Sequence, residues 1–427
     1  MRAALWFLAL FAIAAAVALF AGNNQGTITV FWPPWRVDLS LNLTLLILLA
    51  AFVLMHVALR ALAALFSLPR QARQWRLQQK ERSVHAALLD ALVQLMAGRF
   101  ARSRKAAQAA LVQERTLSAL DAQLPQAQQI RVLAHLLAAE SAQALQDRPA
   151  RDAHLQQALN ESAERAALAS PETREGVQLR AARWALDDRD APAALARLEE
   201  LPQGAQRRTL ALRLRLKAAR QDRRTLEALE TARLLSKHRA FSDAAAQSIV
   251  RGLATELVTS AHDSAQLLRA WGELEPVERE MPEVAIHAAQ RMVALRGDLT
   301  LARAWLLPVW DRMVEQPRSL GESLRVRLVR ALEAGLDSVD AEWLARIEAA
   351  QRNDPRDANL QYLAGMACMK RQLWGKAQQL LTHAGLALQD PGLHRRAWQA
   401  LAQLAEARDD TDQASAAWKR AAQTENP

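Results

Sequence analysis

Histidine and cysteine side chains can bind a metal, and the cysteine thiolate can attack a substrate. The nine histidines are scattered along the chain, and Cys368 is the single cysteine. His56 lies inside a long apolar segment, where an imidazole could ligate a haem iron or hydrogen-bond to a partner helix. A neutral imidazole that pairs with backbone explains the same position, so the sequence leaves both interpretations open.

Spacings typical of catalytic or metal sites are missing from the sequence. No HxxxH or HExxH pair places two imidazoles on one helix face, and no GxGxxG, Walker or GxSxG pattern occurs. A single cysteine excludes both a disulfide framework and a CxxC pair. We therefore expect no enzyme, no catalytic residue and no metal site, and we interpret Cys368 as a small core residue.

Two apolar segments at the start of the chain are each long enough to cross a bilayer as a helix. Residues 3–21 carry no charge, and residues 41–66 are interrupted by few polar side chains. Residues 22–40 between them contain glycines and a Pro-Pro pair, which do not continue a helix. The sequence predicts a transmembrane hairpin over residues 1–67 with a loop at 22–40.

The loop carries aromatic side chains next to a short alternating stretch. Residues 27–32 alternate like a strand, and Trp32 and Trp35 suit the headgroup level of a membrane. We interpret the loop as a tight interfacial connector. The alternative is an edge that docks another membrane protein.

Charge places the large domain on the cytoplasmic side. Residues 60–115 hold eleven basic and three acidic side chains, whereas the loop is neutral. A cleaved signal peptide is the alternative for the first segment, and it leaves the orientation of the second unchanged. We expect lipid headgroups to attract the basic side chains nearest the bilayer, which are Arg60, Arg70, Arg73, Arg76, Lys80 and Arg82.

The rest of the chain is nearly neutral. The first 115 residues hold 13 of the 55 basic and 4 of the 45 acidic side chains, which leaves 42 and 41 for the remainder. The high isoelectric point therefore reflects the membrane-proximal part, and we expect no nucleic-acid partner. Helix-forming residues dominate, so the predicted fold is all-α.

Repeating alanine positions predict an α-solenoid of tetratricopeptide type after the hairpin. Ala377 and Ala414 lie 37 residues apart, close to the period of about 34 of that repeat, and each opens an alanine-rich helix pattern. A generic helical bundle is the alternative. We assign residues 68–262 to a basic juxtamembrane helix and N-terminal repeats, and residues 263–427 to C-terminal repeats.

In such arrays the first helix of each pair lines a concave groove that binds protein partners. The repeat register places a set of polar, methionine and aromatic side chains there, although some of them could instead pack between repeats. The set is Arg183, Tyr362, Met366, Met369, Lys370, Gln399 and Gln403.

Three stretches resemble the HemY family of proteobacterial inner membranes. They are the loop signature at residues 31–43, the run Met96–Phe100 behind a basic helix, and the pattern from Trp271 to Ala302. The resemblance implies an inner-membrane protein with two spans and cytoplasmic tetratricopeptide repeats, associated with late steps of protoheme synthesis. The sequence carries no flavin fingerprint, so no oxidase activity is implied.

Two functions from different classes follow. The first is a scaffold or regulator that gathers haem-synthesis enzymes through its groove. The second is a carrier or sensor that binds haem or a porphyrin through His56, His383 or His394. No CxxCH attachment motif occurs, so the sequence favours the scaffold without a cofactor.

Overall fold

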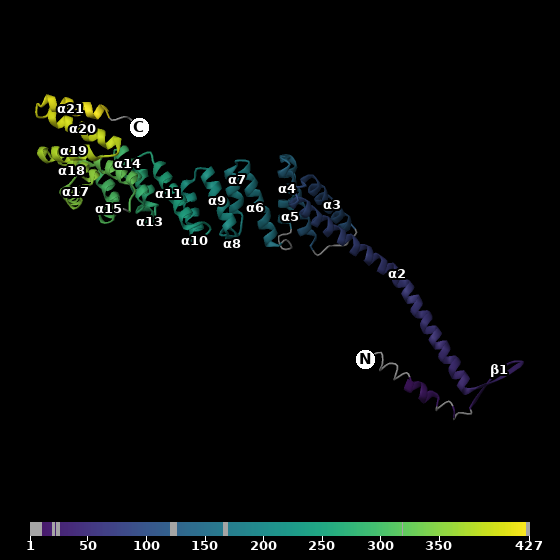
Figure 1. Cartoon of the computed structure of the whole chain (residues 1–427). Coiled ribbons are helices and arrows are strands. Elements are labelled where there is room, and N and C mark those ends of the chain that lie inside the picture. Colours follow the sequence, from purple (N-terminus) through teal and green to yellow (C-terminus); the bar gives the residue numbers. More distant parts are fainter. Residues whose placement is uncertain are drawn as a thin grey trace. The chain divides into compact units, whose positions relative to one another are not determined.

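The computed structural model describes residues 11–18, 22, 26–119, 126–164, 170–317 and 319–423, without the side chains of 63–74, 164 and 338. These residues are mostly helical, as predicted (Figure 1). They form two compact units, residues 1–173 and residues 174–427.

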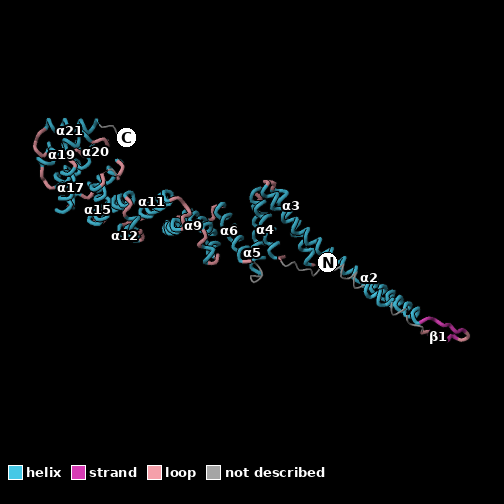
Figure 2. The backbone as a smooth tube through the Cα atoms, turned by 60° about the horizontal axis from the view of Figure 1, so that its bottom comes forward, coloured by secondary structure: helices cyan, strands magenta, loops and turns pink. Residues whose placement is uncertain are grey.

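The first unit contains a β-hairpin that the all-α prediction lacks. Strands β1 (Thr27–Trp32) and β2 (Trp35–Ser40) pair antiparallel, from Thr27 opposite Ser40 to Trp32 opposite Trp35, and appear in magenta in Figure 2. The predicted strand at 27–32 is confirmed. The second strand pairs with it across the turn at Pro33 and Pro34, which are joined by a cis peptide bond.

A single long helix follows the hairpin. Helix α2 (Leu41–Met96) begins where the Ser40 hydroxyl accepts a hydrogen bond from the Leu43 backbone N–H at 3.3 Å. It has 56 residues and therefore a length of about 84 Å at about 1.5 Å per residue. The apolar segment and the basic segment that follows Leu68 and Pro69 are thus one continuous helix.

Three shorter helices follow α2, of which the first two pack against α2 and the third packs against the second. They are α3 (Phe100–Ser118), α4 (Ala127–Ala144) and α5 (Arg148–Glu164). An Ala-Gly-Arg turn joins α2 to α3, and Gly98 adopts a φ of +71° there. Small side chains let the helices approach closely, since Ala91, Ala107 and Ala138 are fully buried.

The second unit is a run of helices that pack against their neighbours in sequence. Helices α18 and α19, and α20 and α21, form the clearest antiparallel pairs at the C-terminal end (Figure 1). The elements are α6 (Pro171–Asp187), α7 (Ala191–Glu199), α8 (Gln203–Gln206), α9 (Thr209–Gln221), α10 (Thr225–Lys237), α11 (Asp243–Thr259), α12 (Ser264–Gly272), α13 (Pro276–Arg279), α14 (Pro282–Ala294), α15 (Leu299–Glu315), α16 (Glu322–Glu333), η1 (Leu336–Ser338), α17 (Ala341–Asn353), α18 (Ala358–Lys370), α19 (Trp374–Ala387), α20 (Pro391–Glu406) and α21 (Thr411–Gln423).

The pairs meet at residues without room for larger side chains. Ala377 of α19 is fully buried, and Ala414 of α21 is nearly so. A methyl group added at Gly365 of α18 would lie 2.7 Å from Leu381 Cγ, and one at Gly385 of α19 would lie 3.0 Å from Trp398 Cε2. One continuous buried cluster extends from Leu212 to Ala421, across the predicted boundary at 262/263.

The predicted membrane hairpin is present only in part. Within the described residues, α2 is the one helix long and apolar enough to cross a membrane, over Leu41–Leu62. The first predicted span falls largely outside the described residues, of which 11–18 are helical. The two-span hairpin and the predicted domain boundaries therefore stay predictions.

Candidate functional site

Helices α14, α16, α18 and α20 form one row of the second unit. Neighbouring backbones in this row approach one another more closely than those in the row of α15, α17, α19 and α21. Helices of the second row are joined by longer side chains. For example, Lys376 Nζ of α19 lies 2.7 Å from Glu348 Oε1 of α17. We call the row of α14, α16, α18 and α20 the inner row.

A charged cluster connects two helices of the inner row across a third. Arg330 of α16 donates to the Asp390 carboxylate at 2.6 Å, and Arg396 of α20 donates to Glu333 of α16 at 2.9 Å. Asp390 also accepts from the Leu393 backbone N–H at 2.8 Å, which caps α20. A methyl group at Gly392 would lie 2.2 Å from Arg330 Nη2, so this glycine lets the guanidinium approach.

Tyr362 lies inside this cluster rather than on an open surface. Its side chain on α18 is fully buried, and burial raises the pKa of its hydroxyl, with a further upward contribution from Glu333. The prediction that Tyr362 lines the groove is wrong. Tyr362 belongs to α18, which contacts both α16 and α20, and the side chains of Glu333 and Arg396 act electrostatically on its hydroxyl.

The other predicted groove residues differ in exposure. Arg183 of α6, Lys370 of α18 and Gln403 of α20 are exposed. Lys370 Nζ lies 2.5 Å from Asp337 Oδ1, so its charge is partly balanced within the unit. Three further members of the set are half-buried, and the methionines among them pack against the core; these are Met366, Met369 and Gln399.

Further polar contacts join α16 to the start of α18. Arg325 forms an ion pair with Asp357, and Asn359 donates to Glu322 at 2.7 Å. Asp357 also caps α18 through the Asn359 backbone N–H at 2.9 Å. Much of the charge on the inner row therefore holds neighbouring repeats together, and the side chains left for a partner are the exposed ones.

Sequence reasoning missed the charged residues of the inner row. Arg330 and Glu333 are one helical turn apart and point to a shared helix face, which was a usable signal. Asp390 before Pro391 is a helix-start signature, and such a signature does not indicate a distant arginine partner. Their pairing is between residues 60 and 63 positions apart, which no local pattern encodes.

Two histidines meet in the first unit. His135 Nδ1 of α4 and His154 Nδ1 of α5 are 3.1 Å apart, so one ring donates an N–H to the other. Burial, followed by His154, lowers the pKa of His135 to about 4. Burial also lowers the pKa of His154, with a smaller contribution from Arg104. Both imidazoles are therefore neutral near pH 7.

The histidines suggested as haem ligands lie in separate places. His56 is exposed on the apolar part of α2, and His383 is exposed on α19. His394 of α20 is half-buried and accepts a hydrogen bond from Trp398 Nε1 at 3.2 Å. Across the described ranges, no group of three or more His, Cys, Asp or Glu side chains could hold a metal ion.

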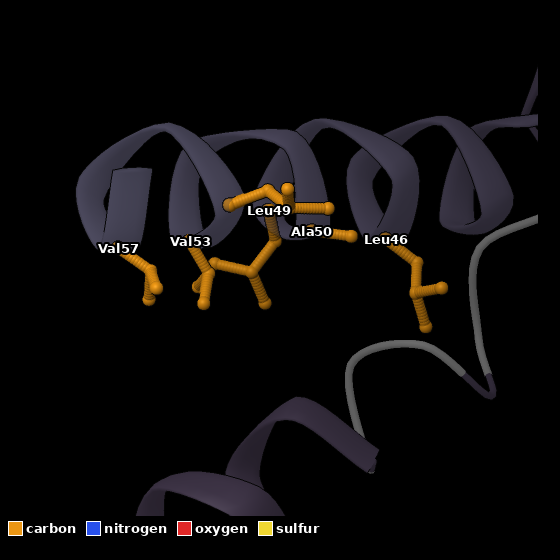
Figure 3. Close-up of a pocket in the computed structure, with 6 residues that line it drawn as sticks. Leu46, Leu49, Ala50, Val53 and Val57 are labelled. Carbon is orange, nitrogen blue, oxygen red and sulfur yellow. The ribbon is translucent and has the colours of Figure 1, made fainter. Parts of the chain in front are cut away.

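The apolar part of α2 presents its side chains outward. Leu41–Leu62 has a mean hydropathy of 2.4, and none of this window is buried within the protein. Leu46, Leu49, Ala50, Val53 and Val57 project from one face (Figure 3). A helix that exposes so many large apolar side chains needs an apolar environment.

The basic side chains at the end of this segment and after it are exposed where the structure describes them. These are Arg60, Arg76, Lys80 and Arg82. The side chains of Arg70 and Arg73 lie outside the described residues, although their backbone belongs to α2. The predicted contact with lipid headgroups stays a prediction.

The first part of the chain is similar to a known protein family. Residues 26–146 match a family model described as HemY protein N-terminus. The match covers the β-hairpin, α2, α3 and α4. It confirms the resemblance found in the sequence for this region. No curated protein sequence matches the chain.

Similar solved structures include two helical proteins. A structure described as Naa15/Naa10 bound to HypK-THB has 15% sequence identity and a TM-score of 0.24, and the match covers 77% of this chain and 56% of that chain. The TPR domain of P58(IPK) has 14% identity and a TM-score of 0.19, with 80% and 98% covered. The chain thus spans little more than half of the first structure's length. The assignment of helical repeats rests on the packing of the helices themselves.

Proposed function

Because residues 26–146 carry the N-terminal region of the HemY family, we propose that this membrane-associated chain is a scaffold or regulator in late protoheme IX synthesis. It performs no catalysis itself. Its tetratricopeptide-type repeats bind one or more haem-synthesis enzymes at the surface of the bacterial inner membrane. Lipid and protein are its partners, and nucleic acid is not.

The continuity of α2 carries this proposal. One helix begins with a segment that suits hydrocarbon and ends packed against α3 and α4. A partner bound to the helical array is therefore held near the bilayer, where its local concentration rises. Tethering of this kind increases the apparent affinity of a second binding event without any new contact.

The inner row supplies the surface for the partner. Its charged cluster fixes α16, α18 and α20 relative to one another, so the exposed Lys370 and Gln403 are presented on a fixed frame. Preorganised side chains lose less entropy on binding than mobile ones. A protein partner can therefore gain affinity from few exposed polar contacts.

The proposed topology follows the charge distribution. Two spans leave residues 22–40 in the periplasm, while the N-terminus and the helical array lie in the cytoplasm. The excess of basic side chains in residues 60–115 supports this orientation.

Capture of partners from solubilised membranes tests the proposal. The double variant Lys370→Ala with Gln403→Ala changes the inner row, and Lys419→Ala with Gln379→Ala is a matched control on α21 and α19, where both residues are exposed. We expect the first variant to lose haem-synthesis enzymes from the eluate and the control to keep them. Thermal unfolding should be nearly equal in the two variants because all four side chains are exposed or surface-paired.

The same eluates separate the scaffold from the haem-binding alternative. A scaffold elutes with enzymes and without stoichiometric porphyrin absorbance. If the inner-row variant keeps its partners while His56→Ala removes bound porphyrin, the scaffold proposal is wrong. The chain is then a haem or porphyrin carrier.

A further inference from the structure

The β-hairpin that precedes α2 separates its side chains by polarity. Partners in an antiparallel ladder point to the same side of the sheet, and successive residues alternate between sides. One face therefore carries three apolar pairs, and the other carries polar pairs together with Phe31. The apolar face consists of Ile28 with Leu39, Val30 with Val37, and Trp32 with Trp35.

The apolar face is open over most of its length. Trp32 and Trp35 are 75% and 73% exposed, and Val30 and Val37 are also exposed. Ile28 and Leu39, nearest the start of α2, are half-buried. A two-stranded hairpin is marginally stable alone, so a cover for this face would stabilise it.

The opposite face satisfies its own polar groups. Arg36 Nε lies 3.3 Å from Asp38 Oδ1, and the Arg36 guanidinium lies over the Phe31 ring at 5.5 Å from its centre. These contacts suit a face that remains in water. The apolar face of the hairpin thus requires an apolar environment, whereas its polar face requires water.

The hairpin is fixed to the apolar helix at its base. The Leu41 backbone N–H donates to the Gly26 carbonyl at 2.8 Å, and the membrane-spanning window begins at Leu41. Figure 2 shows the hairpin directly beyond the N-terminal end of α2. The apolar face therefore begins where the hydrocarbon contact of the helix ends.

We propose that the hairpin lies on the bilayer surface as an amphipathic foot, with its apolar face among the lipid headgroups and upper acyl chains. The occupant of this face is lipid because the face continues the lipid-exposed surface of α2. Its outer end carries two tryptophans, the side chains enriched at membrane interfaces. Strands of six residues extend about 20 Å along that interface.

Spin labels on adjacent residues of the hairpin test the proposal. Val37→Cys and Asp38→Cys place a nitroxide on opposite faces of β2, and Val30→Cys and Thr29→Cys do the same on β1. The natural Cys368 can stay because it is fully buried and burial raises the pKa of its thiol, which slows labelling. The unsubstituted protein is the blank.

The full chain is reconstituted in phosphatidylcholine vesicles, and collisions with oxygen and with a water-soluble nickel complex are measured. Labels at Val30 and Val37 should favour oxygen, and labels at Thr29 and Asp38 should favour the nickel complex. The contrast should persist at high salt because the contact is apolar.

Three outcomes overturn the proposal. Equal nickel access at Val37 and Asp38 means that the apolar face is in water. Loss of the contrast at high salt means that charge holds the hairpin. A Val37 label shielded from both reagents means that protein covers the face, as a docking edge for a membrane protein or a second copy would.

Trp32→Ser with Trp35→Ser checks the role of the tip. In this background the nickel complex should reach a label at Val37, while access at Asp38 stays unchanged. An unchanged Val37 label in the double variant would show that the tryptophans do not hold the face in lipid, and it would also overturn the proposal.

Discussion

The close approach of α18 and α19 makes a sharp prediction for Gly365→Ala. The added methyl group would lie 2.7 Å from Leu381 Cγ, 2.9 Å from its Cδ2 and 3.3 Å from its backbone nitrogen. Leu381 is fully buried, so its branch point cannot move away without displacing the helix. Overpacking of this kind costs about 1–3 kcal/mol, and this contact belongs in the upper half of that range.

Helix propensity acts in the opposite direction. Replacing a mid-helix glycine by alanine stabilises a helix by about 1 kcal/mol. The net expectation for Gly365→Ala is a loss of about 1–2 kcal/mol. Gly252→Ala is the matched control, since Gly252 lies within α11, is exposed and has open space around its Cα. This control should gain about 1 kcal/mol from propensity alone.

Amide hydrogen exchange of the full-length protein in detergent measures both effects. Repeat arrays lose stability locally, so Gly365→Ala should reduce protection in α18 to α21 and leave α3 and α4 unchanged. A loss of about 1.4 kcal/mol corresponds to a tenfold decrease in protection. Equal or greater protection of α18 and α19 in Gly365→Ala would refute the packing argument.

Four further predictions address packing, charge, pH and topology. Ala377→Leu should overpack the same helix pair by about 1–3 kcal/mol and expose α20 and α21 to proteolysis first, and unchanged cleavage there would contradict it. Arg396→Ala should cost about 1–3 kcal/mol in thermal unfolding because the Glu333 side chain, 13% exposed, loses its charged partner, whereas a neutral result would mean that the pair contributes nothing. The pKa of His135 is about 4 in the folded state and near 6.5 in the unfolded state, so the unfolded state binds more protons between these pH values. The free energy of unfolding of the first unit should therefore fall by up to about 3 kcal/mol as the pH is lowered from 6.5 to 4. Thermal melts of His135→Leu should show a weaker pH dependence across this range. A periplasm-specific reporter should be active when inserted at Gly26 and inactive at the C-terminus, and the reverse pattern would overturn the proposed orientation.

Local sequence patterns predicted the helices and the apolar segment well. Composition alone marks residues 41–66, and the Ala-Gly-Arg turn before Phe100 carries its own glycine signal. The second strand of the hairpin was missed although Trp35, Val37 and Leu39 alternate with polar residues. Arg36 and Asp38 lower the apolar content of this strand, so the alternation of apolar and polar residues is a weaker signal there.

The environment of Tyr362 could not be predicted from local pattern. The repeat register predicts that it belongs to the first helix of a pair, which is correct, but the register does not predict its burial. Its hydroxyl is influenced by Glu333 and Arg396, which belong to α16 and α20. The electrostatic partners of a buried side chain of the inner row thus belong to neighbouring repeats.

The passage of α2 through Pro69 is a similar case. A proline inside a helix removes one backbone hydrogen bond and opposes continuation. The structure nonetheless gives one helix from Leu41 to Met96. Favourable helix formers on both sides of the proline explain why the helix can continue.

An uninterrupted α2 has an angular consequence. Successive residues of a helix are rotated by about 100° about its axis. The side of α2 on which α3 and α4 pack, relative to the apolar segment, is therefore set by the number of residues that separate them from it. One residue inserted between Leu62 and Trp75 would turn α3 and α4 by about 100° about the helix axis relative to the apolar segment and move them by about 1.5 Å along it. The direction that α3 and α4 face relative to the apolar segment is thus set by the number of residues in α2.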